Sequence, residues 1–138
     1  FSRGEIREVN GEPVEFILVQ NPISMQLNLD NLQGSPEQVF FAIGRDVHDP
    51  SWMWTVDLNN LKSVSMVGGF NYADAALLLE YHDIPVDAVE REYFKAIDTF
   101  FSLPKPTKGI KTVIYSADAM RRLRRYKGFT DPEDVQRV

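Results

Sequence analysis

The residues best suited to chemistry in this sequence form a polar cluster at positions 45–51, Arg-Asp-Val-His-Asp-Pro-Ser. Its two carboxylates and its imidazole, Asp46, Asp49 and His48, are groups that could hold a divalent cation, or one carboxylate could orient the ring as a base. The alternative, which the residue types alone favour, is a surface loop in which Pro50 begins a turn and the two following tryptophans pack as anchors. A Ser-His-Asp triad inside this loop is disfavoured, because triad members normally come from separate segments.

The composition restricts the chemistry further. The chain has 138 residues, 43% of them apolar and 25% charged, as expected for one soluble domain. It has no cysteine and only two histidines, His48 and His82, which excludes cysteine nucleophiles and, within one chain, a histidine-rich metal site. Its formal charge of -5 has the wrong sign for a surface that follows a phosphate backbone, so nucleic acid is not an expected partner. The longest apolar runs are far below the ~18 residues that cross a bilayer, and no basic-then-apolar leader opens the chain, so we expect a cytoplasmic protein without a transmembrane segment.

Apolar runs alternate along the chain with helical patterns. Short continuous apolar runs predict strands over residues 15–19, 39–43, 64–67, 84–89 and 111–115. Apolar residues at helical spacing predict helices over residues 25–34, 71–81, 93–101 and 116–126. Strands separated by helices predict right-handed crossovers and an α/β fold, an open, mostly parallel sheet with helices on both faces.

Local patterns assign several side chains within these helices. Asn71, with Asp74 three residues later, predicts a capping box, and Ser116 predicts a second N-cap. Phe94 and Tyr126 each stand among the apolar residues of their own predicted helix, so we expect both rings to lie in the core.

In such sheets, ligands bind beyond the carboxyl ends of the strands. The informative segments are therefore Asn21, residues 44–54, residues 68–71 and residues 115–116. Neither GxxxxGK[ST] nor GxGxxG occurs in the sequence, and the glycine pair at 68–69 lacks both a third glycine and a lysine. We therefore do not expect this domain to hold a triphosphate by itself.

Two charged features occur near helix ends. His82, beside Asp83, suits the negative end of a helix dipole. A basic group on the last helix could clamp an anion or an acidic partner, although a solvated face near the helix C-terminus is the favoured interpretation. This group consists of Arg121, Arg122, Arg124, Arg125 and Lys127.

Four segments, in order, carry a resemblance to a known family. Residues 18–22 (LVQNP) are similar to an LxKNP motif, and residues 46–54 (DVHDPSWMW) are similar to DGxDxSWxW, the most specific of the four. Residues 67–81 are similar to GxRxxDxxLRLKY, and residues 115–117 (YSA) are similar to a closing YTA. Together they resemble the C-terminal domain of the MurT family, the Mur-ligase-like subunit of bacterial lipid II isoglutaminyl synthase.

The resemblance implies a Rossmann-like domain of the Mur ligase C-terminal type over residues 1–127, followed by a polar tail, residues 128–138, that we expect to fray. It implies an ATP-dependent ligase that amidates the α-carboxyl of D-glutamate in the lipid II stem peptide during peptidoglycan biosynthesis, with ammonia from a glutaminase subunit, GatD. ATP and Mg²⁺ then belong to the full-length enzyme, and this domain alone is expected to be inactive and to bind neither. Since the chain begins at Phe1 and not at Met, we expect a piece of a longer protein with an upstream Mur ligase central domain.

The resemblance also implies roles for individual residues. In the family, the second aspartate of DGxDxSW completes the catalytic triad of the glutaminase. An ungapped alignment makes this residue Asp49, whereas a gapped alignment on Gly-Arg-Asp makes it Asp46. Such an acid orients a histidine and stabilises its cationic form, so a chain without cysteine can contribute it. Asn21, Pro22 and Ser51 are the residues expected to contact the nucleotide.

The sequence also departs from the family pattern. Gln20 replaces a lysine, Asn71 and Leu78 replace arginines, and Thr55 replaces an acid. This loss of charge supports a second hypothesis, a non-catalytic interaction domain that kept the fold and the partner surface but lost its nucleotide contacts.

Overall fold

The computed structural model describes residues 5–32, 35–47 and 49–129. The described strands are β1 (Glu5–Val9), β2 (Glu12–Leu18), β3 (Val39–Ala42), β4 (Met66–Gly68) and β5 (Lys111–Tyr115). The described helices are α1 (Pro22–Asp30), α2 (Tyr72–Tyr81), α3 (Tyr93–Phe101) and α4 (Ala117–Lys127), with a 3₁₀ helix, η1 (Pro50–Thr55).

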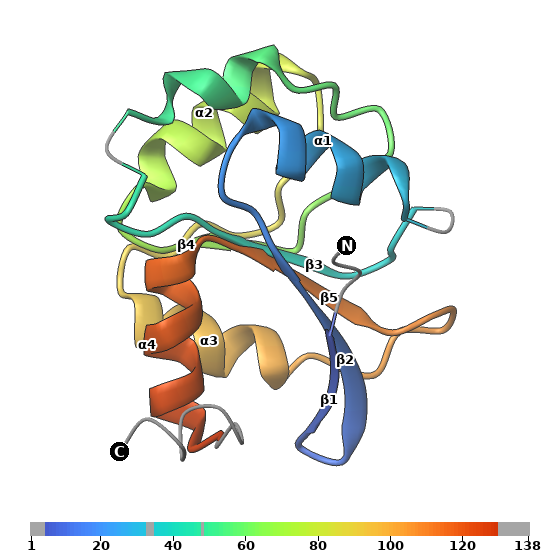
Figure 1. Cartoon of the computed structure of the whole chain (residues 1–138). Helices are drawn as coiled ribbons and strands as arrows, with labels where there is room; N and C mark the ends of the chain where they lie inside the picture. Colours follow the sequence, from blue (N-terminus) through green and yellow to red (C-terminus); the bar gives the residue numbers. More distant parts are fainter. Residues whose placement is uncertain (1–4, 33–34, 48, 130–138) are drawn as a thin grey trace.

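The strands form one sheet in the order β1-β2-β5-β3-β4. β2, β5, β3 and β4 are parallel, and only the edge pair β1 and β2 is antiparallel. Helices α1 and α2 cover one face, and α3 and α4 cover the other (Figure 1). Every residue of β3 and β5 is buried, which explains why both strands are continuously apolar or nearly so in sequence. The predicted α/β fold, an open and mostly parallel sheet with helices on both faces, is confirmed.

Strand β1 was not predicted from the apolar pattern. It pairs with β2 through a two-residue turn made by Asn10 and Gly11, which have φ values of 53° and 85°. Two consecutive positive φ values match a type I′ turn, whose twist suits a hairpin, and Asn-Gly is a strong sequence signal for it. The strand predicted over residues 15–19 is therefore one arm of a hairpin and runs from Glu12 to Leu18.

The predicted strand over residues 84–89 is wrong as a regular strand. This segment forms two isolated parallel bridges, Val64 with Val86 and Val67 with Val89. A regular parallel ladder repeats every two residues, whereas these bridges are three residues apart on both segments. The regular two-residue repeat of backbone pairing is therefore interrupted between the two bridges. The segment only extends the edge of the sheet beside β4.

The prediction of Phe94 and Tyr126 as core residues is also wrong. Their side chains are 46% and 41% exposed, and their rings stack on each other with centroids 4.4 Å apart and planes 6° apart. The Tyr126 hydroxyl donates to Asp98 Oδ2 at 2.6 Å, which holds the ring outside the core. Phe100 and Phe101, on the same helix as Phe94, are buried as predicted.

The predicted tail begins where α4 ends. Gly128 has a φ of 75° and terminates the helix in the left-handed conformation that glycine adopts at low cost. Residues 130–138, on which the prediction of fraying mainly falls, lie outside the described residues. Over the part of the chain that the structure describes, no helix is long and apolar enough to span a membrane.

Candidate functional site

The loops that follow the parallel strands meet at one edge of the sheet. β2 and β3 lead to α1 and η1 on one face, whereas β5 leads to α4 on the other face. β3 and β5 are neighbours in the sheet, so the chain changes face between them. In open α/β sheets this is the place where a crevice forms and ligands bind.

Asp46, in the loop after β3, bonds to the start of α4. Its Oδ2 accepts from the Ala117 N–H at 3.0 Å, and its Oδ1 accepts from the hydroxyl of Ser116 at 2.8 Å. The Ser116 hydroxyl is buried and accepts in turn from the Gly44 N–H at 2.8 Å. Ser116 stands at the predicted N-cap position, but its side chain makes no capping bond. The carboxylate that caps α4 is supplied by Asp46, at the end of the helix where negative charge is stabilising.

Asn71 holds the same loop from the other side. It stands at the N-cap position of α2, but the predicted capping box with Asp74 is absent. Its Nδ2 instead donates to the carbonyl oxygens of Gly44 and Val47, at 2.9 and 2.8 Å. Both of these residues are buried, so their carbonyl groups need a donor within the protein. The loop after β3 is therefore fixed by side chains from two separate segments.

Asp49 is an exposed carboxylate at the start of η1. Its Oδ1 accepts from both the hydroxyl and the N–H of Ser51, at 2.7 and 3.1 Å. These two bonds, the hydroxyl first, hold the pKa of Asp49 below its usual value, so the group is charged at neutral pH. The hydroxyl of Ser51, a residue predicted to contact the nucleotide, is thus engaged in a hydrogen bond to Asp49. His48, the third titratable group of the polar cluster, lies outside the described residues.

The helix η1 is anchored mainly by Met53, which is completely buried between α1 and α2 and their neighbours. Trp52 is half-buried against the same core, as predicted for an anchor. Trp54 is exposed, and its ring lies 5.0 Å from that of Tyr81 on α2. The prediction of a surface loop with two tryptophan anchors is therefore only partly correct. Asp49 caps the start of a packed 3₁₀ helix, and the tryptophans belong to that helix and not to an irregular loop.

Asn21 and Pro22 begin α1 at the carboxyl end of β2. Asn21 Oδ1 accepts from the Ser24 N–H at 2.8 Å, and Ser24 Oγ accepts from the Asn21 N–H at 3.2 Å. This is a complete capping box, with proline at the first helical position where its missing N–H costs nothing. Among the described residues, no hydrogen bond joins Asn21 to Asp46 or Asp49. The predicted site residues thus share one edge of the sheet but form three separate local networks.

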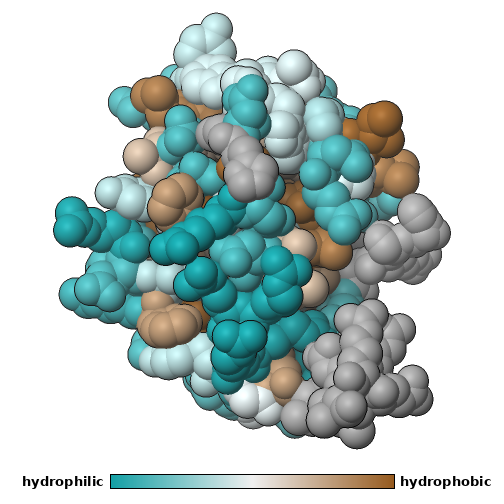
Figure 2. Space-filling view, turned by 60° about the vertical axis from the view of Figure 1, so that its left-hand side comes forward, coloured by the Kyte–Doolittle hydropathy of each residue, from teal (hydrophilic) through white to brown (hydrophobic). Residues whose placement is uncertain are grey.

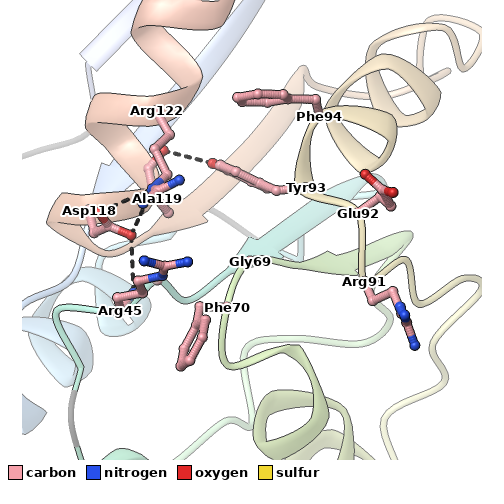
Figure 3. Close-up of a pocket in the computed structure, with 11 residues that line it drawn as sticks. Arg45, Gly69, Phe70, Arg91, Glu92, Tyr93, Phe94, Asp118, Ala119 and Arg122 are labelled. Carbon is pink, nitrogen blue, oxygen red and sulfur yellow. Dashed lines mark hydrogen bonds and ion pairs between the residues drawn. The ribbon is translucent and has the colours of Figure 1, made fainter.

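A pocket of about 330 Å³ opens at the same edge, between the loops after β3 and β4 and the first turns of α3 and α4 (Figure 3). Asp118 lies on one wall, where its Oδ2 accepts from the Arg45 N–H at 3.1 Å and its carboxylate accepts from Arg122 Nε at 3.2 Å. Burial raises the pKa of Asp118, but these hydrogen bonds outweigh it and hold the pKa below the usual value. The exposed rings of Phe70 and Phe94 supply apolar lining.

This pocket could not be predicted from the sequence. The segments after β3 and β4 could be placed at the edge, but no local signal brings residues 91–94 or the face of α4 beside them. Tyr93 explains the contact, because its hydroxyl donates to the Ala119 carbonyl oxygen at 2.7 Å and ties α3 to α4. Burial raises the pKa of Tyr93, so this hydroxyl stays protonated and acts as a fixed donor. In the described part of the chain, no group of three or more histidine, aspartate or glutamate side chains is arranged to hold a metal ion.

The chain matches the model of a known protein family. The model of the family described as MurT ligase C-terminal matches residues 18–117, more than half of the chain. The matched range runs from the end of β2 to the first residue of α4, and it includes Asn21, the polar cluster at 45–51 and Ser116. A search of curated proteins found no match to this chain.

Proposed function

Because this chain belongs to the MurT ligase C-terminal family, we propose that it is the C-terminal domain of an ATP-dependent ligase subunit that amidates the α-carboxyl of D-glutamate in the lipid II stem peptide. In this proposal the domain docks a GatD-like glutaminase that supplies ammonia, works in the cytoplasm together with an upstream Mur ligase central domain, and has no activity alone.

The observation that carries this proposal is the state of Asp49. A carboxylate that completes a partner's triad must be charged, reachable from outside and held in place. Asp49 is exposed, its pKa is lowered, and it stands on a helix anchored by buried Met53. Both bonds that it accepts from described residues fall on Oδ1, so Oδ2 is the atom we assign to a histidine N–H of the partner.

Asp46, the other candidate, is less suited to that role. Its two oxygens accept from Ser116 and Ala117, so both take part in starting α4. Turning either oxygen toward a partner would leave a buried hydroxyl or a helix N-terminal N–H unpaired, which costs free energy. We therefore assign Asp49 as the triad-completing carboxylate and Asp46 as a structural one.

The described residues could contact a nucleotide through side chains, but they do not form a phosphate-binding loop. The turn after β2 contains Asn21 and Pro22 in a helix start, without the glycines that let backbone N–H groups close on phosphate. The capping box uses Asn21 Oδ1, so the Nδ2 donors of Asn21, with Pro22 and Ser51, are the groups we propose to lie against ATP. The triphosphate and Mg²⁺ would be held by the upstream domain, and ATP would supply the energy that activates the carboxyl group for attack by ammonia.

The test is Asp49→Asn in the complete complex of ligase and glutaminase. Asparagine retains Oδ1 for Ser51 but cannot stabilise a histidine cation, so glutamine hydrolysis should fall by roughly 10²- to 10⁴-fold. Amidation driven by added ammonium salt should remain, because it bypasses the glutaminase. Asp87→Asn, at an exposed aspartate between the bridged residues Val86 and Val89, is the matched control and should change neither rate. Unchanged glutamine hydrolysis in Asp49→Asn would refute the assigned role.

A non-catalytic interaction domain is the second candidate. It is favoured by Asn71, which stands where the family has an arginine and uses its amide to hold the loop after β3. Titration calorimetry of the complete protein with ATP distinguishes the two functions. Saturable binding supports the ligase, whereas a complete protein without a detectable ATP site supports the interaction domain.

A further inference from the structure

A groove extends from the pocket along the outside of α4. A second cavity, of about 390 Å³, adjoins the first, and the two share Phe94, Asp118 and Arg122. The second cavity is lined in addition by Arg121, Arg125 and Tyr126. We call the two cavities together the α3–α4 groove. Figure 2 shows that the face carrying α4 has a strongly hydrophilic centre with smaller apolar areas beside it.

The groove collects positive charge on a chain whose net charge is -5. Five exposed arginines line it, Arg45, Arg91, Arg121, Arg122 and Arg125, against two carboxylates, Glu92 and Asp118. Among the described residues, Arg122 alone of these five forms an ion pair, with Asp118. The Arg45 guanidinium lies 5.1 Å from the centre of the Phe70 ring, a cation–π contact that keeps it beside the pocket (Figure 3). The groove therefore has positive charge that the described part of the chain does not neutralise.

Exposed aromatic rings alternate with these arginines. Phe70 is 62% exposed at one end of the groove, and the stacked pair of Phe94 and Tyr126 forms a flat apolar wall farther along. Aromatic and arginine side chains together are enriched in surfaces that bind other proteins, because each buries a large area and loses little conformational entropy. A ligand for this groove needs both carboxylates and apolar side chains.

We propose that the α3–α4 groove binds an extended acidic peptide segment of a partner protein. The planar guanidinium groups of Arg121 and Arg125 match carboxylates, and the wall of Phe94 and Tyr126 takes an apolar side chain between them. Two adjoining cavities suit an extended chain better than a single small ion. Asp118 in the middle of the groove, and the overall negative charge, disfavour a polyphosphate or an anionic membrane, both of which need uniformly positive surfaces.

The sequence alone favoured a solvated face for the basic residues of α4. The structure supports the other interpretation, an acidic partner, because Arg45 from a distant loop joins the arginines of α4 around one groove. Binding at this groove does not require the proposed amidation, since Asp49 and Asn21 do not line it.

The test measures the fluorescence anisotropy of a short fluorescein-labelled peptide of Glu-Glu-Leu repeats added to the purified 138-residue chain. We expect saturable binding that weakens about tenfold in the double variant Arg121→Ala/Arg125→Ala, since each exposed arginine–carboxylate pair contributes up to about fivefold. Lys62→Ala/Lys105→Ala is the matched control, because both lysines are exposed, carry the same charge and line neither cavity, and it should bind like the unaltered chain. Any binding of a peptide of Lys-Lys-Leu repeats should not weaken in the double variant, because such a peptide does not pair with the arginines of the groove.

Two competing ligands complete the experiment. Inorganic pyrophosphate and vesicles containing phosphatidylglycerol are titrated in parallel. If either binds at the groove more tightly than the acidic peptide, or if the double variant binds that peptide with unchanged affinity, the groove is not an acidic-peptide site. Circular dichroism of each variant confirms that lost binding is not lost folding.

Discussion

Replacing Asp46 by alanine removes the carboxylate that joins the loop after β3 to the start of α4. Its two oxygens accept from the Ala117 N–H and the Ser116 hydroxyl, at 3.0 and 2.8 Å. The loop and the helix are about 70 residues apart in the sequence, so these two bonds are a long-range contact of the fold. Asp46→Ala therefore tests whether this side chain is structural.

The expected loss in free energy of unfolding follows from the two hydrogen bonds that are removed. Losing a side-chain cap at a helix N-terminus costs about 1 kcal/mol. Leaving the buried Ser116 hydroxyl without its acceptor costs about 1 kcal/mol more, at the low end of the usual range because that hydroxyl still accepts from Gly44. The expected loss is about 2 kcal/mol, or roughly 7 °C in melting temperature for a domain of this size.

Thermal unfolding and urea denaturation of the purified chain measure this loss. Asp49→Ala is the comparison: it removes the N-cap of the short helix η1, but the N–H and hydroxyl that Asp49 accepts from belong to exposed Ser51 and can bond to water instead, so it should lose clearly less stability than Asp46→Ala. Asp46→Asn, which retains one acceptor oxygen, should fall between the two. A melting temperature of Asp46→Ala within about 1 °C of the unaltered chain would contradict the structural role, and Asp46 would become available again as the partner's carboxylate.

Three further results are expected. Gly69→Ala should cost about 2–4 kcal/mol in urea denaturation, because Gly69 has a φ of 91° and a Cβ there would lie 2.6 Å from a backbone oxygen of the loop after β3. Lys111→Met should cost about 3 kcal/mol, because the buried Lys111 ammonium bonds Glu12 at 2.7 Å, and adding Glu12→Gln should restore part of the loss in a double-mutant cycle. The hydrogen bond from Arg124 lowers the pKa of Glu5 from its usual 4.5. The stability that this bond contributes is therefore complete above about pH 4.5 and is lost as the pH falls through the lower pKa of the folded state. The difference in melting temperature between the unaltered chain and Arg124→Gln should be larger at pH 7 than below that lower pKa.

The elements that pack the core could be predicted because their signals are local. β3 and β5 are apolar runs buried on both faces, and Met25 and Leu29 of α1 recur at the spacing of one helical turn and are buried. β1 could not be found in this way, because an edge strand with one buried residue, Val9, has no apolar periodicity to detect. Its signal is the Asn-Gly turn that follows it, so turn chemistry has to be considered together with hydrophobicity.

The candidate site could be predicted only as far as the loops that form it. Ligand-binding rules for parallel sheets place Asp46, Asn71 and Ser116 at one edge, and they do meet there. Local capping rules, however, assign Asn71 and Ser116 to their own helices, because those rules consider only donors nearby in the sequence. In the structure the Asn71 side chain is oriented so that its Nδ2 donates to the buried carbonyl groups of the loop after β3. This arrangement is favoured because an unpaired buried carbonyl group costs more free energy than a helix N–H that water can reach. Ser116 likewise bonds to that loop, and α4 is capped by a carboxylate 70 positions earlier than its own N-cap residue. This exchange of partners supports our proposed assignment of the two carboxylates: the loop uses Asp46 for its own bonds to α4, whereas Asp49 remains exposed to a second protein.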